Sequence, residues 1–179
     1  MASTPTRLMT VAEFEAIPNP PGARYELHHG ELVEVGYPKH RHVRIQRQLR
    51  RLLEEATDET GVVHTEMPYR PLPENECWGA DVAYLSKARW DLIGEYLDGV
   101  PDLVVEVLSP SNTASEMLDK RQLCLEHGAK EFWIVDPDRR QVEVSTPDGR
   151  VVPYKIGQRI PLRIIGSGTT SLSVEEIFA

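Results

Sequence analysis

The segment spanning residues 100–110 places the strongest constraint on how this chain can fold. Its middle, residues 103–108, consists of aliphatic and β-branched residues interrupted by one acid, Glu106. Such a run is typical of a central strand that is covered on both faces of a sheet. A carboxylate inside that strand is unfavourable unless it is paired, hydrogen-bonded or bound to a metal ion. Glu106 is therefore either a structural acid or part of an active site at the end of a buried strand.

Length and composition predict one soluble domain covering residues 1–179. The chain lacks any run of about 18 apolar residues, the minimum for a membrane span. It also lacks an apolar signal segment at its start, which predicts a cytoplasmic protein. Two distant cysteines disfavour both structural zinc and a disulfide framework. The formal net charge of −8 argues against a non-specific nucleic-acid coat protein, but it leaves a local basic face or an acidic metal site open.

The hydrophobic pattern predicts an α/β (α+β) fold, in which helices cover a mixed central sheet. A capped helix near residues 10–17 precedes a hairpin at 24–35, and an amphipathic helix at 41–57 follows. Strands are predicted at 62–69, 78–85, 103–108 and 130–135, and a last hairpin at 141–155. Residues 109–112 are predicted to cap a helix from about 113 to 127, and a short helix ends the chain at 174–178.

One side of the helix at 41–57 carries a row of arginines formed by Arg44, Arg47 and Arg51. The opposite side carries the apolar residues expected in the core, together with His42 near the start of the helix. Rows of charge on a helix are usually solvated, but this row could also contact the phosphates of a nucleic acid. Both interpretations stay open at this point, because the acids that follow at positions 54, 55, 58 and 59 dilute the basic patch.

Asp81, which opens an apolar stretch, is the best partner for Glu106. Asp102 shares the strand of Glu106, but four strand residues span about 13 Å, too far for both to bind one ion. If the strands of Asp81 and Glu106 are neighbours, both carboxylates can reach the same cation. Magnesium suits such an all-oxygen site. Lys120 could approach the same site from the following helix, although spacing alone favours an ordinary exposed lysine.

These residues resemble a known family. Four segments look like the Uma2 (DUF820) endonucleases. They are Arg-Tyr-Glu-Leu-His-His-Gly-Glu-Leu-Val, which contains Glu26, then Asp81-Val, Pro-Asp-Leu-Val-Val-Glu106-Val-Leu-Ser-Pro-Ser and Gly-Ala-Lys-Glu-Phe-Trp-Ile-Val-Asp-Pro. The resemblance implies a restriction-endonuclease-like, PD-(D/E)xK fold with Asp81 and Glu106 holding Mg²⁺ or Mn²⁺. It also implies that Lys120 lies near the attacking water, with Glu26 and His42 as further cleft residues.

The same resemblance implies hydrolysis of DNA phosphodiester bonds by a homo-oligomer, most simply a dimer. In this sequence Ala80 replaces the proline of the superfamily motif, and Leu108 stands where the motif has its lysine. A catalytically inactive binding or scaffold protein with the same fold is the alternative, and the net charge favours it. Hydrolysis of a small phosphate ester is a third interpretation, which suits an acidic protein better than cleavage of a duplex.

Overall fold

A computed structural model of the protein describes residues 7–57, 59–110, 112–165 and 170–179. The helices are α1 (Val11–Glu15), α2 (His40–Thr57), α3 (Lys87–Trp90), α4 (Ala114–Glu126) and α5 (Val174–Ile177). The strands are β1 (Ala23–His28), β2 (Glu31–Gly36), β3 (Gly61–Tyr69), β4 (Trp78–Ser86), β5 (Leu103–Val107), β6 (Glu131–Asp136), β7 (Gln141–Ser145), β8 (Val151–Lys155), β9 (Arg159–Pro161) and β10 (Ser171–Ser173).

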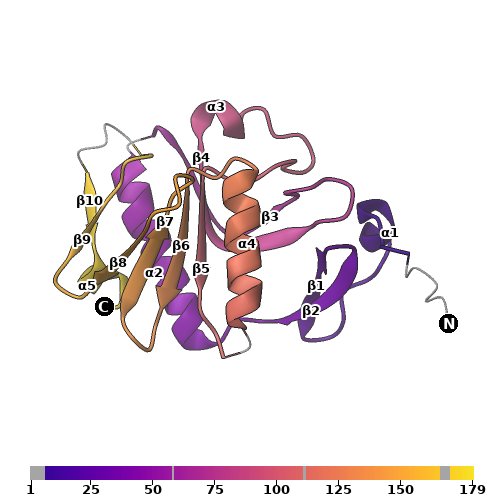
Figure 1. Ribbon diagram of the computed structural model, residues 1–179, viewed down its shortest axis with the longest axis horizontal. Helices are drawn as coiled ribbons and strands as arrows, with labels where there is room; N and C mark the ends of the chain where they lie inside the picture. Colours follow the sequence, from indigo (N-terminus) through magenta and orange to yellow (C-terminus); the bar gives the residue numbers. More distant parts are fainter. Residues whose placement is uncertain (1–6, 58, 111, 166–169) are drawn as a thin grey trace.

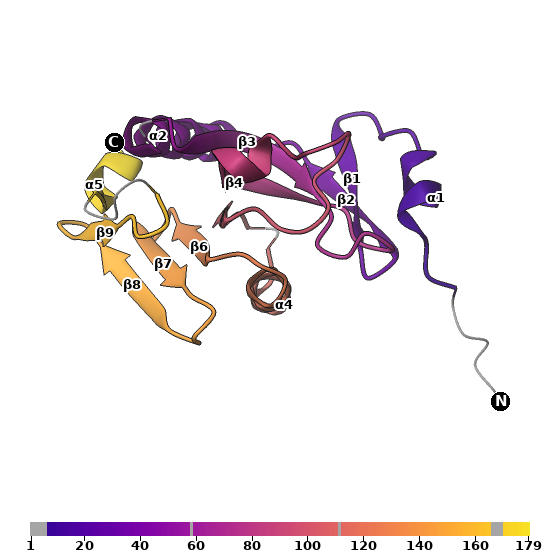
Figure 2. The same ribbon diagram turned by 90° about the horizontal axis from the view of Figure 1, so that it is seen from above.

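The six strands of the central sheet are arranged in the order β3-β4-β5-β6-β7-β8. Strands β5 and β6 run parallel, and α4 makes the crossover between them, whereas the other neighbouring pairs are antiparallel (Figure 1). Helices α2 and α4 cover opposite faces of the sheet, as the view from above makes clear (Figure 2). The predicted α+β fold with a mixed central sheet between helices is therefore confirmed.

Each face of the sheet has its own apolar core. The amphipathic stripe of α2 packs on one face, where Leu49 and Leu53 are fully buried, as the helical periodicity predicts. On the other face, Cys124 of α4 packs with Phe132 of β6 and Val104 of β5. The strand β5 is buried along its whole length, which agrees with its apolar sequence. This double covering explains why a carboxylate on β5 must find polar partners.

The hairpin of β3 and β4 changes face halfway along its length. Val63 and Met67 are four residues apart and would share a face in a regular strand, yet they belong to different cores. Val82 and Ala80 on β4 are divided between the two cores in the same way. Glu66, which lies between Val63 and Met67, has a φ of 53°, in the left-handed region. The hairpin therefore twists at Glu66, and its outer half extends toward β1 and β2 (Figure 2).

Some local predictions need correction. Thr113, and not residues 109–112, is the N-cap of α4, since its side chain accepts a hydrogen bond from the Glu116 amide in a capping box. Asn112 instead accepts the Ser109 amide at 2.7 Å. The two short strands β9 and β10 were not predicted, because three residues carry too little pattern to recognise. Within the described part of the chain, none of the helices has the length and apolar character needed to cross a membrane.

Candidate active site

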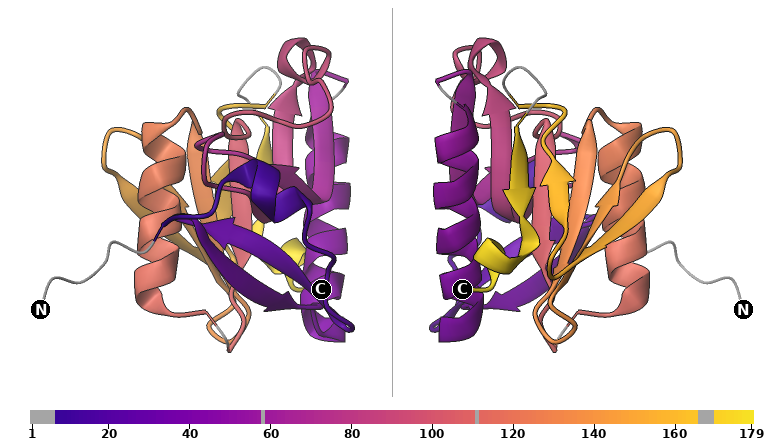
Figure 3. Two further views of the ribbon diagram at one scale, coloured as in Figure 1. Left: turned by 90° about the vertical axis from the view of Figure 1, so that its right-hand side faces the viewer. Right: turned by 90° about the vertical axis from the view of Figure 1, so that its left-hand side faces the viewer.

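A cleft of about 810 Å³ opens where the β1–β2 hairpin, the start of α2 and one side of α4 meet the central sheet. Figure 3 shows the hairpin lying across this end of the molecule, between the two large helices. All five residues predicted as catalytic, which are Glu26, His42, Asp81, Glu106 and Lys120, line the cleft. They come from β1, α2, β4, β5 and α4 respectively. The fold therefore brings together side chains that are up to 94 positions apart in the sequence.

Asp81 and Glu106 lie on neighbouring antiparallel strands. The ladder between β4 and β5 ends at the pair Val82 and Val105, and the next position along each strand is Asp81 and Glu106. Just beyond the ladder, the Val107 amide donates to Asp81 Oδ2 at 2.6 Å. The carboxylate of Asp81 thus replaces a backbone acceptor where the two strands separate. The strands that carry these two acids are therefore neighbours, which the sequence alone could only propose.

Glu106 and Lys120 form a buried pair, with Lys120 Nζ 2.9 Å from Glu106 Oε1. Their side chains are 10% and 8% exposed, so water solvates neither charge well. Burial raises the pKa of Glu106 to about 8; Asp81 adds to the rise and Lys120 opposes it. Glu106 Oε1 is a buried oxygen, and among the described residues the Lys120 ammonium is its close polar partner. The raised pKa shows that one ammonium does not fully offset the cost of burying the Glu106 carboxylate.

Glu26 is the second acid whose charge acts on Lys120. Burial alone would raise the pKa of Glu26, but the charge of Lys120 and the hydrogen bond with His28 lower it to about 2. Burial would likewise lower the pKa of Lys120, but Glu106 and Glu26 together raise it above its usual value. Lys120 Nζ also donates to the Gly79 carbonyl at 2.9 Å. Because Glu26 stays ionised, Lys120 keeps a charged partner even when Glu106 is protonated.

The comparison with family models matches residues 11–175 to Uma2, described as "Putative restriction endonuclease". The chain belongs to the Uma2 family. A solved structure described as a putative nuclease belonging to DUF820, from Anabaena variabilis, superposes with a TM-score of 0.79. It is 19% identical and covers 95% of this chain and 97% of its own, so the likeness concerns the fold. No curated protein sequence matches the chain.

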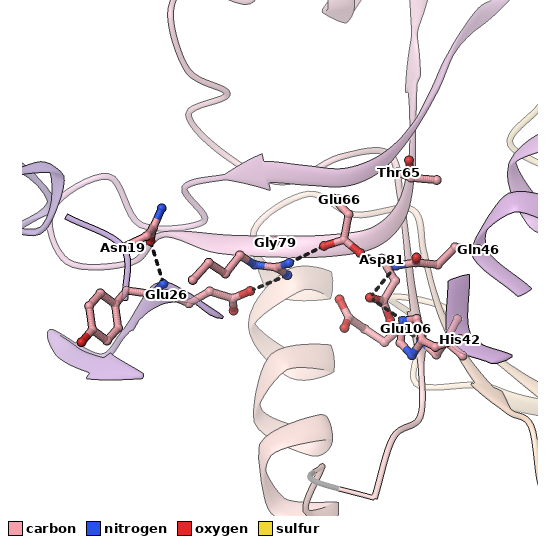
Figure 4. A network of polar contacts seen from close by, with 12 residues as sticks. Asn19, Glu26, His42, Gln46, Thr65, Glu66, Gly79, Asp81 and Glu106 are labelled. Carbon is pink, nitrogen blue, oxygen red and sulfur yellow. Dashed lines mark hydrogen bonds and ion pairs between the residues drawn. The ribbon is translucent and has the colours of Figure 1, made fainter. Parts of the chain in front are cut away.

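Several polar residues of this Uma2 chain that sequence reasoning missed connect the predicted ones. His42 Nε2 lies 3.0 Å from Asp81 Oδ1, and Gln46, one helical turn later, donates to the same oxygen at 3.0 Å. Gln46 also donates to Glu66, which accepts from Arg24 as well. Figure 4 shows this network running from Asp81 through Gln46 and Glu66 toward Glu26. A glutamine inside the apolar stripe of α2 was the one sequence signal for it.

Gly79 makes room for part of this network. A Cβ atom at position 79 would lie 3.0 Å from Arg24 Nη2 and 3.1 Å from Glu26 Oε1. The space that a side chain would fill is therefore occupied by the Arg24–Glu26 pair, whose atoms are 3.2 Å apart. The same glycine supplies the carbonyl that Lys120 binds. Gly79 thus lets the carboxylate and the ammonium approach the strand closely.

The arginines predicted to bind nucleic acid lie elsewhere. Arg44, Arg47 and Arg51 are not among the residues that line the cleft. Arg44 donates to the Ala179 carbonyl at 3.2 Å, and Arg51 is paired with Glu55 on the solvated side of α2. Exposed ion pairs and contacts with backbone carbonyls of this kind are typical of a solvated helix face. Nucleic-acid contact by these three residues stays a prediction.

Asp102, which strand length excluded as a partner of Glu106, has a structural environment of its own. It is 1% exposed, and it accepts the Ser86 amide at 2.9 Å. Arg89 and Lys130 lie 3.2 and 3.0 Å from its Oδ1 atom. Burial opposes the ionised form, but the Ser86 amide and these two cations lower the pKa of Asp102. One buried acid therefore precedes β5 and the other lies near its end, and of the two Glu106 lines the cleft.

The residues of this Uma2 chain fit a divalent cation that binds few protein ligands. Asp81 and Glu106 provide two carboxylates in one cleft, and the raised pKa of Glu106 shows that Lys120 alone does not offset the burial of its charge. The described residues contain no group of three or more His, Cys, Asp and Glu suited to a metal ion. Two carboxylates with water and substrate oxygens as the other ligands suit Mg²⁺ or Mn²⁺, whereas zinc prefers nitrogen and sulfur.

Proposed function

We propose that this Uma2 protein is an endonuclease that hydrolyses phosphodiester bonds in DNA with the help of Mg²⁺ or Mn²⁺. The observation that carries the proposal is the pair of carboxylates from adjacent strands, Asp81 and Glu106, with Lys120 Nζ 2.9 Å from Glu106 inside one cleft. Membership of a family described as a restriction endonuclease supports the same reaction class. Asp81 and Glu106 would hold the ion, which supplies Lewis acidity toward a phosphoryl oxygen.

Lys120 contributes a fixed positive charge to this reaction and not a base. Its pKa is raised by Glu106 and Glu26, so the ammonium keeps its proton near neutral pH. A protonated amine in a buried position stabilises negative charge that develops on a phosphate oxygen. Glu26 supplies a second negative charge that keeps that amine protonated. His42 contacts Asp81 Oδ1 and thereby holds the Asp81 carboxylate in the direction of the cleft.

The function is tested by incubating the protein with supercoiled plasmid in Mg²⁺, in Mn²⁺ and in a chelator. Nicking or linearisation that requires the metal, and that is lost in Asp81→Asn and Lys120→Met, is the expected result. Glu131→Gln is the matched control, because Glu131 is a buried acid outside the cleft and should leave cleavage intact. A binding test accompanies it, since a ligand at a hundred times its Kd stabilises a protein by about 2.7 kcal/mol. Absence of any melting shift with millimolar metal would refute the metal-dependent mechanism.

One observation favours a smaller substrate as the second candidate. The residues lining the cleft include nine acids, Glu26, Glu34, Glu66, Asp81, Glu106, Glu116, Asp119, Asp136 and Asp138, against five lysines and arginines. Such a lining repels a polyanionic duplex more strongly than a single phosphate. Comparing plasmid with mononucleotide esters distinguishes the two substrates. Metal binding without hydrolysis of either would support the inactive scaffold; a dimeric state and a cytoplasmic location stay predictions.

A further inference from the structure

Glu66 adopts a backbone conformation that a glutamate rarely takes within a strand. Its φ is 53°, in the left-handed region, although it lies in the middle of β3. The ladder pairs Thr65 with Val82 and Met67 with Ala80, and it is interrupted between them, at Glu66 and Asp81. Glycine would adopt this conformation without a steric penalty. A residue held in a strained backbone conformation is usually stabilised there by contacts with the surrounding structure.

The carboxylate of Glu66 joins two hydrogen-bonded chains. Gln46 Nε2 donates to Glu66 Oε1 and, at 3.0 Å, to Asp81 Oδ1. Arg24 Nη1 donates to Glu66 Oε2 at 2.5 Å, and Arg24 Nη2 donates to Glu26 Oε1 at 3.2 Å. Figure 4 shows Glu66 between the two branches, with Asp81 at the end of one and Glu26 at the end of the other. Gln46 belongs to α2 and Arg24 to β1, so the two branches come from different sides of the cleft.

We propose that Glu66 is a positioning residue, which sets the Asp81 and Glu26 carboxylates relative to each other by holding Gln46 and Arg24. The inference deepens the proposed function and rests on it for its catalytic meaning. A side-chain amide can rotate freely unless both of its partners are fixed, and Glu66 is the second partner of Gln46. Arg24 is likewise oriented by a carboxylate on each side. Replacing Glu66 therefore loosens both ends of the site through Gln46, which Glu66 shares with Asp81, and through Arg24, which it shares with Glu26.

The positioning role is tested first in the metal-free protein by amide hydrogen exchange. The Val107 amide donates to Asp81 Oδ2, and Glu66 makes no described contact with it. In Glu66→Gly, which suits the left-handed conformation, we expect Val107 to exchange about tenfold faster or more, because its bond to a charged acceptor weakens. The neighbouring Leu108 amide, which donates to the Val135 carbonyl at 2.9 Å, should be unchanged and reports any general loosening.

Glu59→Gly is the matched control variant. Glu59 also has a left-handed backbone, with φ 65°, but it is exposed and does not line the cleft. It removes the same side chain and relieves the same kind of strain, so it should leave Val107 exchange unaltered. Glu66→Asn, whose side chain also tolerates this conformation but is one carbon shorter, should repeat the effect of Glu66→Gly. Val107 exchange that stays at the wild-type rate in both Glu66 variants overturns the inference.

A Mn²⁺ titration then connects the inference to the proposed function. Loss of a residue that orients a metal ligand typically weakens metal affinity by about 10- to 100-fold. We expect a loss of this size in Glu66→Gly, none in Glu59→Gly, and no further loss when Glu66→Gly is added to Gln46→Ala. Equal losses with and without Gln46 would contradict a role exerted through that glutamine. A wild-type protein that binds no Mn²⁺ would refute the metal-dependent function, while the exchange of Val107 would still decide the role of Glu66.

Discussion

The substitution Glu106→Gln makes the strongest prediction about the metal-free protein, because it removes a buried acid whose titration differs between the folded and unfolded chain. Burial raises the pKa of Glu106 to about 8 from its ordinary value of 4.5. Below about pH 4.5 the acid is neutral in both states, so its ionisation makes no contribution to the difference in stability between wild type and Glu106→Gln. Between the two pKa values the unfolded chain ionises this group and the folded chain does not.

The raised pKa therefore gives wild type a contribution to stability that is present at low pH and is lost as the pH rises toward 8. Each pKa unit corresponds to about 1.4 kcal/mol, so the stability gap in favour of Glu106→Gln should grow by about that much per pH unit and approach 5 kcal/mol as an upper limit. Urea unfolding of both proteins at pH values from about 4.5 to 9 measures the gap. Other titrating groups largely cancel in the difference between the two curves.

Two results would refute this reasoning. A gap that does not change with pH, or one that shrinks as the pH rises, would mean that pairing with Lys120 keeps Glu106 ionised in spite of its burial. Glu131→Gln is the matched control, because burial also raises the pKa of Glu131 at a site away from the cleft. Its gap should have the same sign. Saturating Mg²⁺ should reverse the gap of Glu106→Gln alone, since only Glu106 is proposed to bind the ion.

Three further predictions follow from the same geometry. Apparent affinity for Mn²⁺ should rise about 50-fold from pH 6 to pH 8 in a calorimetric titration, because binding requires ionised Glu106 with a pKa of about 8; an affinity independent of pH would contradict this. Lys120→Met should cost roughly 3–5 kcal/mol in urea unfolding at neutral pH, because it leaves the buried, ionised Glu26 without the ammonium charge that lowers its pKa. Gly79→Ala should reduce plasmid cleavage more than stability, because its Cβ displaces Arg24 and Glu26, whereas Gly36→Ala, with open space around it, should do neither.

The parts of the fold that the sequence predicted are those with a long, regular pattern. The apolar run at residues 103–108 identified β5 within one residue, and the 3.6-residue period identified α2 and its buried leucines. The placement of Asp81 beside Glu106 needed one more assumption, that their strands are neighbours. The sequence contains no direct signal for strand order, because register depends on contacts between residues far apart in the chain.

The residues that sequence reasoning missed owe their positions to tertiary structure. Nothing in the run that contains Glu66 predicts a left-handed residue, since its neighbours alternate as in an ordinary strand. Arg24 reads as a solvated hairpin residue, and only the folded chain shows that it lies over Gly79. Gln46 was the exception, because a glutamine on the apolar side of α2 required a buried partner that could have been sought.

The location of the candidate site follows from two interruptions in the same sheet. Strands β4 and β5 stop pairing after Val82 and Val105, and the β3–β4 ladder is broken at Glu66 and Asp81. Each interruption leaves backbone groups and buried space that polar side chains can use, as Asp81 does when it accepts the Val107 amide. A regular ladder through this region would pair the backbone completely and would give these acids no common opening. The break in the sheet therefore brings Asp81, Glu106 and Lys120 to one cleft, and restoring regular pairing at position 66 would be expected to close it.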